Sequence, residues 1–236
     1  MEKVLQVRIL LLLVIIFTCV GCTNDDVIRG NKASFTKVYS NILSRSFDIQ
    51  REKSAASDTI YDREWLSKFT QPIIGISAPK RSEQAALVAL GNQDEKLTWV
   101  SADGISVSFA NGILIATRGY SQDLMESRHG DQFSLFTRNT KKHFKTHRYL
   151  DGQNGYIELN FSCSFKSINN NVSYLLDIKL KTTKFTESCT AGTFRHINEY
   201  HVLPKTNIVI KSKQWVSESN GYILVYNYYA FQNNLF

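Results

Sequence analysis

The first apolar segment of the chain lies at the N-terminus and has no polar position on either face. Residues 9–17 are uninterruptedly apolar, and the cations Lys3 and Arg8 precede them. A charged region followed by a short apolar region is typical of a secretory signal. The segment is shorter than the about 20 apolar residues that a transmembrane helix needs. The pattern therefore predicts a signal peptide over residues 1–21, with a buried N-terminal core element as the alternative.

The second apolar pattern has the period of a helix. Between residues 32 and 48, large apolar side chains recur at helical spacing, at Phe35, Val38, Tyr39, Ile42 and Leu43. This spacing predicts an amphipathic N-terminal helix over residues 32–48, capped by Asn31 or Ser34. The polar residues 22–31 predict a short tether before this helix, and a further helical turn is predicted at residues 61–69.

From Pro72 onward the apolar period changes from that of a helix to that of a strand. The clearest signal lies in residues 97–117, where three apolar runs are separated by Asp103-Gly104 and Asn111-Gly112. Asp-Gly and Asn-Gly supply the positive φ angles that two-residue hairpin turns require. These residues therefore predict a three-stranded antiparallel meander.

Further strands are predicted on both sides of this meander, at residues 73–77, 85–90, 144–150, 155–165, 172–183, 193–202, 207–217 and 222–231. Turns are predicted at residues 169–171 and 219–221, and a short helix is one interpretation of the less regular residues 119–142. Neither a repeat nor a low-complexity linker interrupts the pattern. We therefore expect a mainly β single domain over residues 32–236, with antiparallel meanders that form a curved sheet, a sandwich or a barrel.

The signal segment ends in Val20-Gly21-Cys22, where a small residue stands directly before a cysteine. This ending is similar to a lipobox, although Cys19 occupies the position where Leu is usual. The Cys22 thiol would take a diacylglycerol, and the peptide bond after Gly21 would be cut. Two or more acyl chains give stable anchoring in a membrane. Since Thr23 rather than Asp follows the cysteine, we expect a lipoprotein of the outer membrane.

Two cysteines remain after the signal peptide and the anchor are assigned, Cys163 and Cys189. An even pair in an oxidising compartment predicts a disulfide. Closing a loop of that length would contribute roughly 3 kcal/mol in the chain-entropy model. Two buried free thiols are the alternative.

The chain is basic, with 28 Lys and Arg against 21 Asp and Glu and a formal net charge of +7. Outside the cytoplasm, such a charge favours anionic lipid headgroups, lipopolysaccharide phosphates or acidic polysaccharide, and the compartment excludes nucleic acid. The densest basic stretch lies in residues 138–149 and predicts a binding surface that includes Lys141, Lys142, Lys145 and Arg148. A solvated edge strand protected by lysines is the alternative.

The sequence contains few signals for chemistry. There is no Gly-rich phosphate loop, no GxSxG and no HExxH. His143 and His147 share one face of a strand, whereas His196 and His201 fall on opposite faces, so we expect solvent-facing histidines and no metal site. No cofactor is predicted. Catalysis by two carboxylates stays open, because glycosidase pairs are assembled in space rather than in sequence.

Three segments together resemble one family. The segments from Trp99 to Gly104, from Asn111 to Gly119 and from Lys211 to Ser217 resemble the YjbF-type, or group 4 capsule (GfcB-type), lipoproteins. Glu218 departs from that pattern, since a proline is expected there. The resemblance implies a mainly antiparallel β lipoprotein of the outer membrane that works in capsule or exopolysaccharide production beside export components. It brings no catalytic residues to this chain.

Three hypotheses for the function follow. The first is a non-catalytic accessory of polysaccharide secretion that binds glycan or a partner export protein, favoured by a polar groove with exposed aromatics. The second is a carrier or acceptor of lipid or lipoprotein, favoured by a deep apolar cavity. The third is a polysaccharide-modifying enzyme, favoured by two carboxylates across a cleft.

Strand alternation places the neighbouring side chains of Gln214 and Trp215 on opposite faces of a strand. If Trp215 lies in the core, Gln214 faces outward, and we expect it to be a binding residue.

Overall fold

The computed structural model of the chain describes residues 61–93, 96–129, 136, 142–151, 155–233 and 235. These residues belong to one compact unit, Ala55–Phe236. The predicted signal peptide, the anchor Cys22, the tether and the helix at residues 32–48 lie outside the described residues. Within the described part of the chain, no helix is long and apolar enough to cross a membrane.

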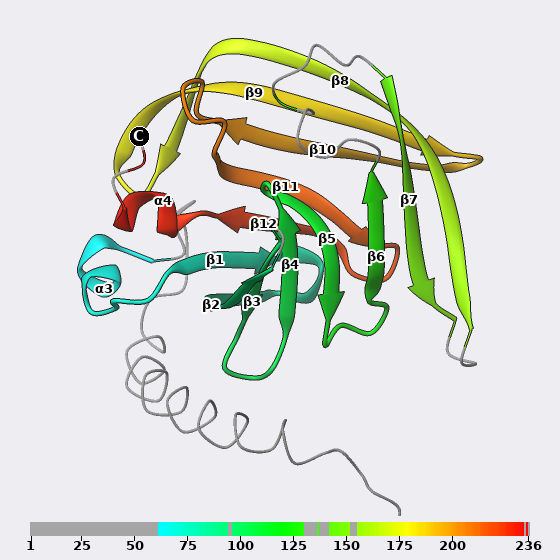
Figure 1. Cartoon of the computed structure of the whole chain (residues 1–236), viewed down its shortest axis with the longest axis horizontal. Helices are drawn as coiled ribbons and strands as arrows, with labels where there is room; N and C mark the ends of the chain where they lie inside the picture. Colours follow the sequence, from blue (N-terminus) through cyan, green and yellow to red (C-terminus); the bar gives the residue numbers. More distant parts are fainter. Residues whose placement is uncertain are drawn as a thin grey trace, which may run out of the picture. The chain divides into compact units, whose positions relative to one another are not determined.

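Twelve antiparallel strands form one sheet, so the predicted mainly β class is confirmed (Figure 1). The strands are β1 (Ile73–Ala78), β2 (Glu83–Gln93), β3 (Lys96–Val100), β4 (Ser106–Ala110), β5 (Ile113–Arg118), β6 (Leu124–His129), β7 (Lys142–Leu150), β8 (Tyr156–Leu175), β9 (Ile178–Ala191), β10 (Phe194–Val202), β11 (Val209–Ser217) and β12 (Gly221–Tyr226). The short helices are α3 (Arg63–Ser67), α4 (Tyr228–Gln232) and the 3-10 turn η2 (Pro79–Arg81).

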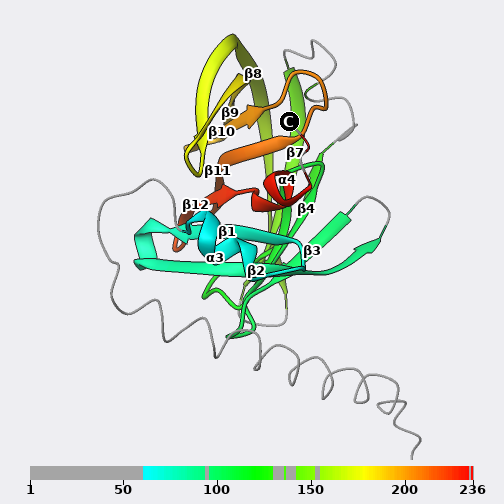
Figure 2. The ribbon, with the colours of Figure 1, turned by 90° about the vertical axis from the view of Figure 1, so that its left-hand side faces the viewer.

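The strand order shows how the sheet becomes a barrel. It runs β5-β4-β3-β2-β1-β12-β11-β10-β9-β8-β7-β6, so the first and last described strands pair in its middle. The two ends of this order, β5 and β6, are neighbours in space (Figures 1 and 2). The sheet is therefore a nearly closed barrel, one of the three architectures that the sequence predicts.

Side chains, rather than a backbone ladder, bridge β5 and β6. The Arg118 guanidinium donates to the carbonyl oxygens of Leu124 and Met125, each at 3.3 Å. Across the same seam, the backbone N–H of Leu124 donates to Thr117 Oγ1 at 2.9 Å, and that hydroxyl donates to Asp123 at 2.8 Å. These bonds satisfy strand-edge groups that an open sheet would expose.

Among the described residues, the apolar core consists of two large clusters and two small ones. The two large clusters lie on opposite faces of the sheet. The larger lies inside the barrel and includes Ile76, Leu87 and Ile223. The smaller lies on the opposite face of β1 and β12, where α3 and α4 cover the sheet (Figure 2). The approach of α4 is so close that a Cβ at Gly75 would lie 2.7 Å from the Tyr228 ring. Glycine is therefore required at this position of β1.

The predicted three-stranded meander is confirmed as β3, β4 and β5, but two other predictions are wrong. The chain does not turn at residues 169–171, where β8 continues through a bulge and Asn170 has φ 55°. It reverses at Leu176 instead, also at φ 55°. The predicted last strand ends at Tyr226 rather than at Phe231. The Asn227 side chain then accepts from Ala230 N and begins α4. The described part of residues 119–142 contains β6, and the rest of the segment interpreted as a short helix lies outside the described residues.

The disulfide between Cys163 and Cys189 is confirmed. The two residues face each other in the β8–β9 register, with their Cα atoms 4.1 Å apart. Both are buried and pack against Phe161, so the alternative of free thiols is wrong.

Candidate functional site

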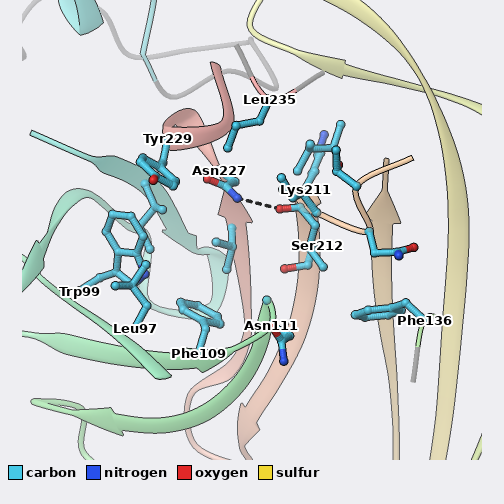
Figure 3. A pocket seen from close by; sticks show the side chains of 18 residues that line it. Leu97, Trp99, Phe109, Asn111, Phe136, Lys211, Ser212, Asn227, Tyr229 and Leu235 are labelled. Atoms are coloured by element: carbon cyan, nitrogen blue, oxygen red, sulfur yellow. Dashed lines mark hydrogen bonds between the residues drawn. The ribbon is translucent and has the colours of Figure 1, made fainter. Parts of the chain in front are cut away.

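A partly open cavity of about 610 Å³ lies inside the barrel (Figure 3). Its apolar wall comes from β1, β3, β4 and β12, with Ile74, Leu97, Trp99, Phe109 and Val225. The rest of the lining comes from the β4–β5 turn, the β10–β11 connection, β11, the start of α4, Phe136 and Leu235. Lining side chains from these separate elements point toward a common space, which only the folded barrel creates.

Two polar side chains of the cavity wall, those of Asn227 and Ser212, are already hydrogen-bonded within the fold. Asn227 donates through Nδ2 to the Val209 carbonyl at 2.9 Å and accepts from Ala230 N through Oδ1 at 3.2 Å. Ser212 Oγ accepts from Gln214 Nε2 at 2.9 Å. The described lining residues include no Asp or Glu. The inner wall therefore offers mainly apolar contact.

Gln214 lies beside this cavity and joins β11 to the β4–β5 hairpin. Its Oε1 accepts from Leu114 N at 2.8 Å, and its Nε2 donates to the Gly112 carbonyl at 2.8 Å. The hairpin presses so closely on β11 that a Cβ at Gly112 would lie 2.5 Å from Val209 Cγ2. Two segments that carry the family resemblance, around Asn111-Gly112 and Gln214, therefore meet inside the barrel.

The expected outward orientation of Gln214 is wrong, because its side chain is 1% exposed. Trp215 is half-buried, and its ring stacks on the imidazole of His196. The β4–β5 hairpin covers Gln214, and His196 covers one face of the Trp215 ring. The β10–β11 ladder ends at the Glu199–Lys213 pair. Beyond it, the backbone N–H of Trp215 donates to the Asn198 side chain at 2.8 Å instead.

We therefore expect Gln214→Ala to destabilise the protein by about 1–3 kcal/mol, since it leaves buried backbone groups of the β4–β5 hairpin without partners. Urea unfolding of the purified variant measures this change. Lys213→Ala is the matched control, because Lys213 is the exposed neighbour on the same strand and should leave stability nearly unchanged. Equal stability of the two variants would contradict the bridging role of Gln214.

The second interior feature is a buried polar cluster around Glu187. This carboxylate is fully buried and accepts from four donors: Lys145 Nζ at 2.6 Å, His143 Nε2 at 2.7 Å, Asn198 Nδ2 at 2.7 Å and the Tyr200 hydroxyl at 3.2 Å. Burial alone would raise the pKa of Glu187, but the Lys145 charge and the hydrogen bonds outweigh it and hold this pKa well below its usual value. Glu187 is therefore an ionised and saturated acceptor.

Two further histidines lie in the same interior. His147 packs against Phe161 and stacks on His196, with ring centroids 5.1 and 5.7 Å away. The Tyr149 hydroxyl donates to the Val216 carbonyl at 2.9 Å, so it accepts from His147 Nδ1, also at 2.9 Å. This arrangement requires a proton on His147 Nδ1, and the ring is neutral because burial lowers the pKa of His147 well below its ordinary value.

The predicted basic surface is divided by strand alternation. Lys142 is exposed, but Lys145 is 2% exposed and paired with Glu187, so it cannot belong to an outer surface. Arg148 is half-buried and pairs with Glu126 and Glu158 at 3.3 and 2.8 Å, while Lys141 lies outside the described residues. The expectation of solvent-facing histidines is likewise wrong for His143, His147 and His196, whose side chains are buried.

One set of metal-ligand types occurs in this cluster. The ligand atoms of His143, Cys163 and Glu187 lie within 4.8 Å of one another. The Cys163 sulfur is bonded to Cys189, so it does not present the thiolate that binds metal. This set therefore carries no metal site in the oxidised protein.

The sequence analysis missed Glu187 and Asn198. The sequence contains a signal for Glu187, because strand alternation places it on the same, inward face of β9 as Phe185 and Cys189. Asn198 holds the corresponding inward position on β10, opposite Glu187 in the register. A polar residue between apolar inward positions of two paired strands is the pattern that would have found both.

These features define a nearly closed antiparallel β-barrel with a partly open cavity and a buried polar cluster. The family model described as group 4 capsule polysaccharide lipoprotein GfcB, YjbF matches residues 35–225. The chain therefore belongs to this family, and the resemblance found in the sequence is confirmed.

A solved structure supports the fold. The crystal structure of the hypothetical lipoprotein YmcC from Escherichia coli (K12) superposes with a TM-score of 0.62 at 14% identity. The match covers 74% of this chain and 96% of that chain. Among curated proteins, none matches this chain.

Proposed function

We propose that this lipoprotein is a non-catalytic accessory in the secretion or assembly of capsule or exopolysaccharide. In this proposal the acylated Cys22 holds it at the periplasmic face of the outer membrane, where it binds glycan or a partner export protein. The observation that carries the proposal is the match to the group 4 capsule polysaccharide lipoprotein family over residues 35–225.

The interior geometry supports binding rather than hydrolysis. Glycosidases use two carboxylates that face each other across a cleft at roughly 5–9.5 Å. None of the described residues that line the cavity is Asp or Glu, and Glu187 is saturated by four donors. A carboxylate with that many partners is a poor proton donor or nucleophile.

The outer face of the barrel offers groups that suit an anionic partner. Lys213 is exposed, and its Nζ lies 4.5 Å from the centroid of the Tyr222 ring. A cation beside an aromatic ring can contact both the charge and the apolar face of an acidic sugar.

Replacement of Cys22 by Ser is expected to abolish acylation, because the hydroxyl cannot act as the thiol nucleophile that receives the lipid. Metabolic labelling with an alkyne fatty acid, followed by gel fluorescence, measures acylation. Cys19→Ser is the matched control, since it alters a cysteine three residues away and should keep the label. Labelled Cys22→Ser protein would contradict the anchor assignment.

The same alleles test the function in cells. A strain that lacks the gene should lose most of its surface polysaccharide, and the wild-type and Cys19→Ser alleles should restore it. The Cys22→Ser allele should not, because the protein would no longer be held at the membrane. Normal surface polysaccharide in the deletion strain would refute the proposed role.

A further inference from the structure

We propose that the outer face of the β8–β9 hairpin lies against a membrane surface that contains anionic lipid. The contact residues near the end of the hairpin are Val172, Tyr174, Lys179 and Lys181, and we call them the hairpin patch. This inference rests on the proposed lipid anchor. It goes beyond the proposed function, because it concerns how the barrel meets the membrane and not how it meets polysaccharide.

The register of the hairpin places apolar and cationic side chains side by side. Tyr174 pairs with Lys179, and Val172 pairs with Lys181, so these four residues share one face of the two strands. Val172 is 45% exposed and Tyr174 is 56% exposed, and both lysines are exposed. Leu180, between the two lysines, is buried, which identifies the hairpin patch as the outer face.

The inner face of the hairpin is fixed to the core. Leu175 and Leu180 are buried in the apolar cluster that also contains Trp65 of α3. Figure 1 shows β8 and β9 curving across the barrel toward α4. Val172 and Tyr174 belong to none of the apolar clusters of the described residues. Two well-packed strands therefore present apolar side chains that do not complete the core.

The lysines of the hairpin patch keep their charge available for a partner. The described ion pairs of this region are Arg63–Asp177 and Lys184–Glu199. Neither Lys179 nor Lys181 forms an ion pair with a described residue, and the hairpin patch itself contains no carboxylate. Lysines near an anionic leaflet are attracted to its headgroups. The hairpin patch is therefore complementary in charge to anionic lipid.

The apolar half of the hairpin patch favours lipid over an acidic sugar. A sugar needs hydrogen-bond partners for its hydroxyl groups, and Val172 offers none. A tyrosine ring suits the headgroup level of a membrane, where its body is in apolar surroundings and its hydroxyl is wet. Lysine stems lie along apolar surface while their ammonium groups stay in the polar layer. An interfacial membrane contact thus uses all four side chains.

The hairpin patch lies near the point where the anchored segment enters the barrel. The chain that leads from Cys22 reaches the described part at Tyr61, directly before α3. Arg63 of α3 pairs with Asp177 at the reversal of the hairpin, so this entry point is close to the hairpin patch. A tethered surface meets its partner at a high effective concentration. A weak contact is therefore sufficient to orient the barrel on the membrane.

Vesicle binding by the unlipidated chain tests the hairpin patch apart from the anchor. This chain begins at Thr23 and retains the whole compact unit, Ala55–Phe236. It should sediment with vesicles of equimolar phosphatidylglycerol and phosphatidylcholine, and stay in solution with phosphatidylcholine alone. Lys179→Glu combined with Lys181→Glu should weaken binding at least about tenfold, because the attraction of two lysines to the headgroups becomes repulsion.

Lys96→Glu combined with Lys142→Glu is the matched control. Both lysines are exposed on other strands, and the net charge changes by the same amount. This variant should bind the anionic vesicles nearly as the wild type does. Equal weakening in the two variants would show that net charge causes the binding, and it would overturn the proposal. Absence of binding by the wild type, or equal binding to the neutral vesicles, would also overturn it.

A fluorescent label tests the orientation of the acylated protein in a membrane. Val172→Cys provides a thiol for a nitrobenzoxadiazole label, since Cys163 and Cys189 are bonded to each other. In the anionic vesicles this label should brighten and be quenched by spin-labelled lipid. A label at Phe144→Cys is the control, because Phe144 is 78% exposed on β7 and should stay in water. Equal quenching of the two labels would overturn the proposed orientation.

An acidic polysaccharide is the alternative occupant of the hairpin patch. Tighter binding of the unlipidated chain to polygalacturonate than to the anionic vesicles, lost in the Lys179 and Lys181 variant, would assign the hairpin patch to glycan and overturn the proposal. Sedimentation requires neither acylation nor surface polysaccharide. Failure of the hairpin patch in this assay and failure of the proposed function in cells are therefore distinguishable.

Discussion

Glu187→Ala is expected to lower the free energy of unfolding by about 3–5 kcal/mol, the usual cost of removing one partner of a buried ion pair. The substitution leaves the Lys145 ammonium buried without its counter-charge. It also removes the acceptor of His143, Asn198 and Tyr200. Guanidinium unfolding at neutral pH, followed by tryptophan fluorescence, measures the change.

Two further variants show whether the charge pair is responsible. Glu158→Ala removes an exposed carboxylate that pairs with Arg148, and it should change stability little. The double substitution Lys145→Met and Glu187→Leu should cost less than Glu187→Ala, because it leaves no unpaired buried charge. If Glu187→Ala is as stable as Glu158→Ala, the buried cluster does not stabilise the fold.

Local chemistry was sufficient to predict part of this barrel. The β3–β4–β5 meander follows from Asp103-Gly104 and Asn111-Gly112, whose glycines adopt φ 88° and 80°. The pairing of Cys163 with Cys189 follows from compartment and cysteine number. Each of these predictions depends on residues close in sequence or on a residue type with few alternatives.

Long-range pairing could not be predicted in the same way. Gln214 bonds to Leu114, which is 100 residues earlier in the chain. Strand alternation predicts only that the side chains of Gln214 and Trp215 lie on opposite faces of β11. It does not predict that the β4–β5 hairpin covers one of these faces, or that Trp215 stacks on His196 on the other. Both contacts, the one between Gln214 and the hairpin and the one between Trp215 and His196, form only when distant strands come together in the barrel.

The Asn-rich segment at residues 169–171 shows a related ambiguity. Asn tolerates the left-handed conformation in a turn and in a bulge alike, so composition alone does not distinguish them. The register decides, because β8 continues to pair with β9 from Asn171 to Leu175. The reversal falls at Leu176, a residue type that gives no turn signal.

The buried histidines should make the fold sensitive to mild acid. Burial, with a smaller contribution from the Lys145 charge, lowers the pKa of His129 to about 3 and that of His196 to about 4. The same causes lower the pKa of His147 well below its ordinary value. In the unfolded chain each imidazole titrates near about 6.5. Between these values the unfolded chain binds more protons than the folded one, so stability falls as pH falls.

Each of these three histidines contributes up to about 1.4 kcal/mol per pH unit below about pH 6.5. Together they should cost about 4 kcal/mol at a pH one unit lower. Glu187 adds little to this loss between pH 7.5 and 5.5, because its carboxylate is ionised there both in the folded state, where its pKa is lowered, and in the unfolded chain, where it titrates at about 4.3; its own contribution is lost only at lower pH. Guanidinium unfolding at pH 7.5 and 5.5 measures the effect.

His147→Phe identifies the source of the acid sensitivity. A phenyl ring can retain the contacts with Phe161 and His196 but cannot bind a proton. The variant should therefore lose about 1.4 kcal/mol of the difference in stability between the two pH values, even if its stability at pH 7.5 is lower. His196→Phe should behave in the same way, since its imidazole is buried in the same stack. A pH dependence identical to that of the wild type in both variants would show that these rings do not cause the acid sensitivity.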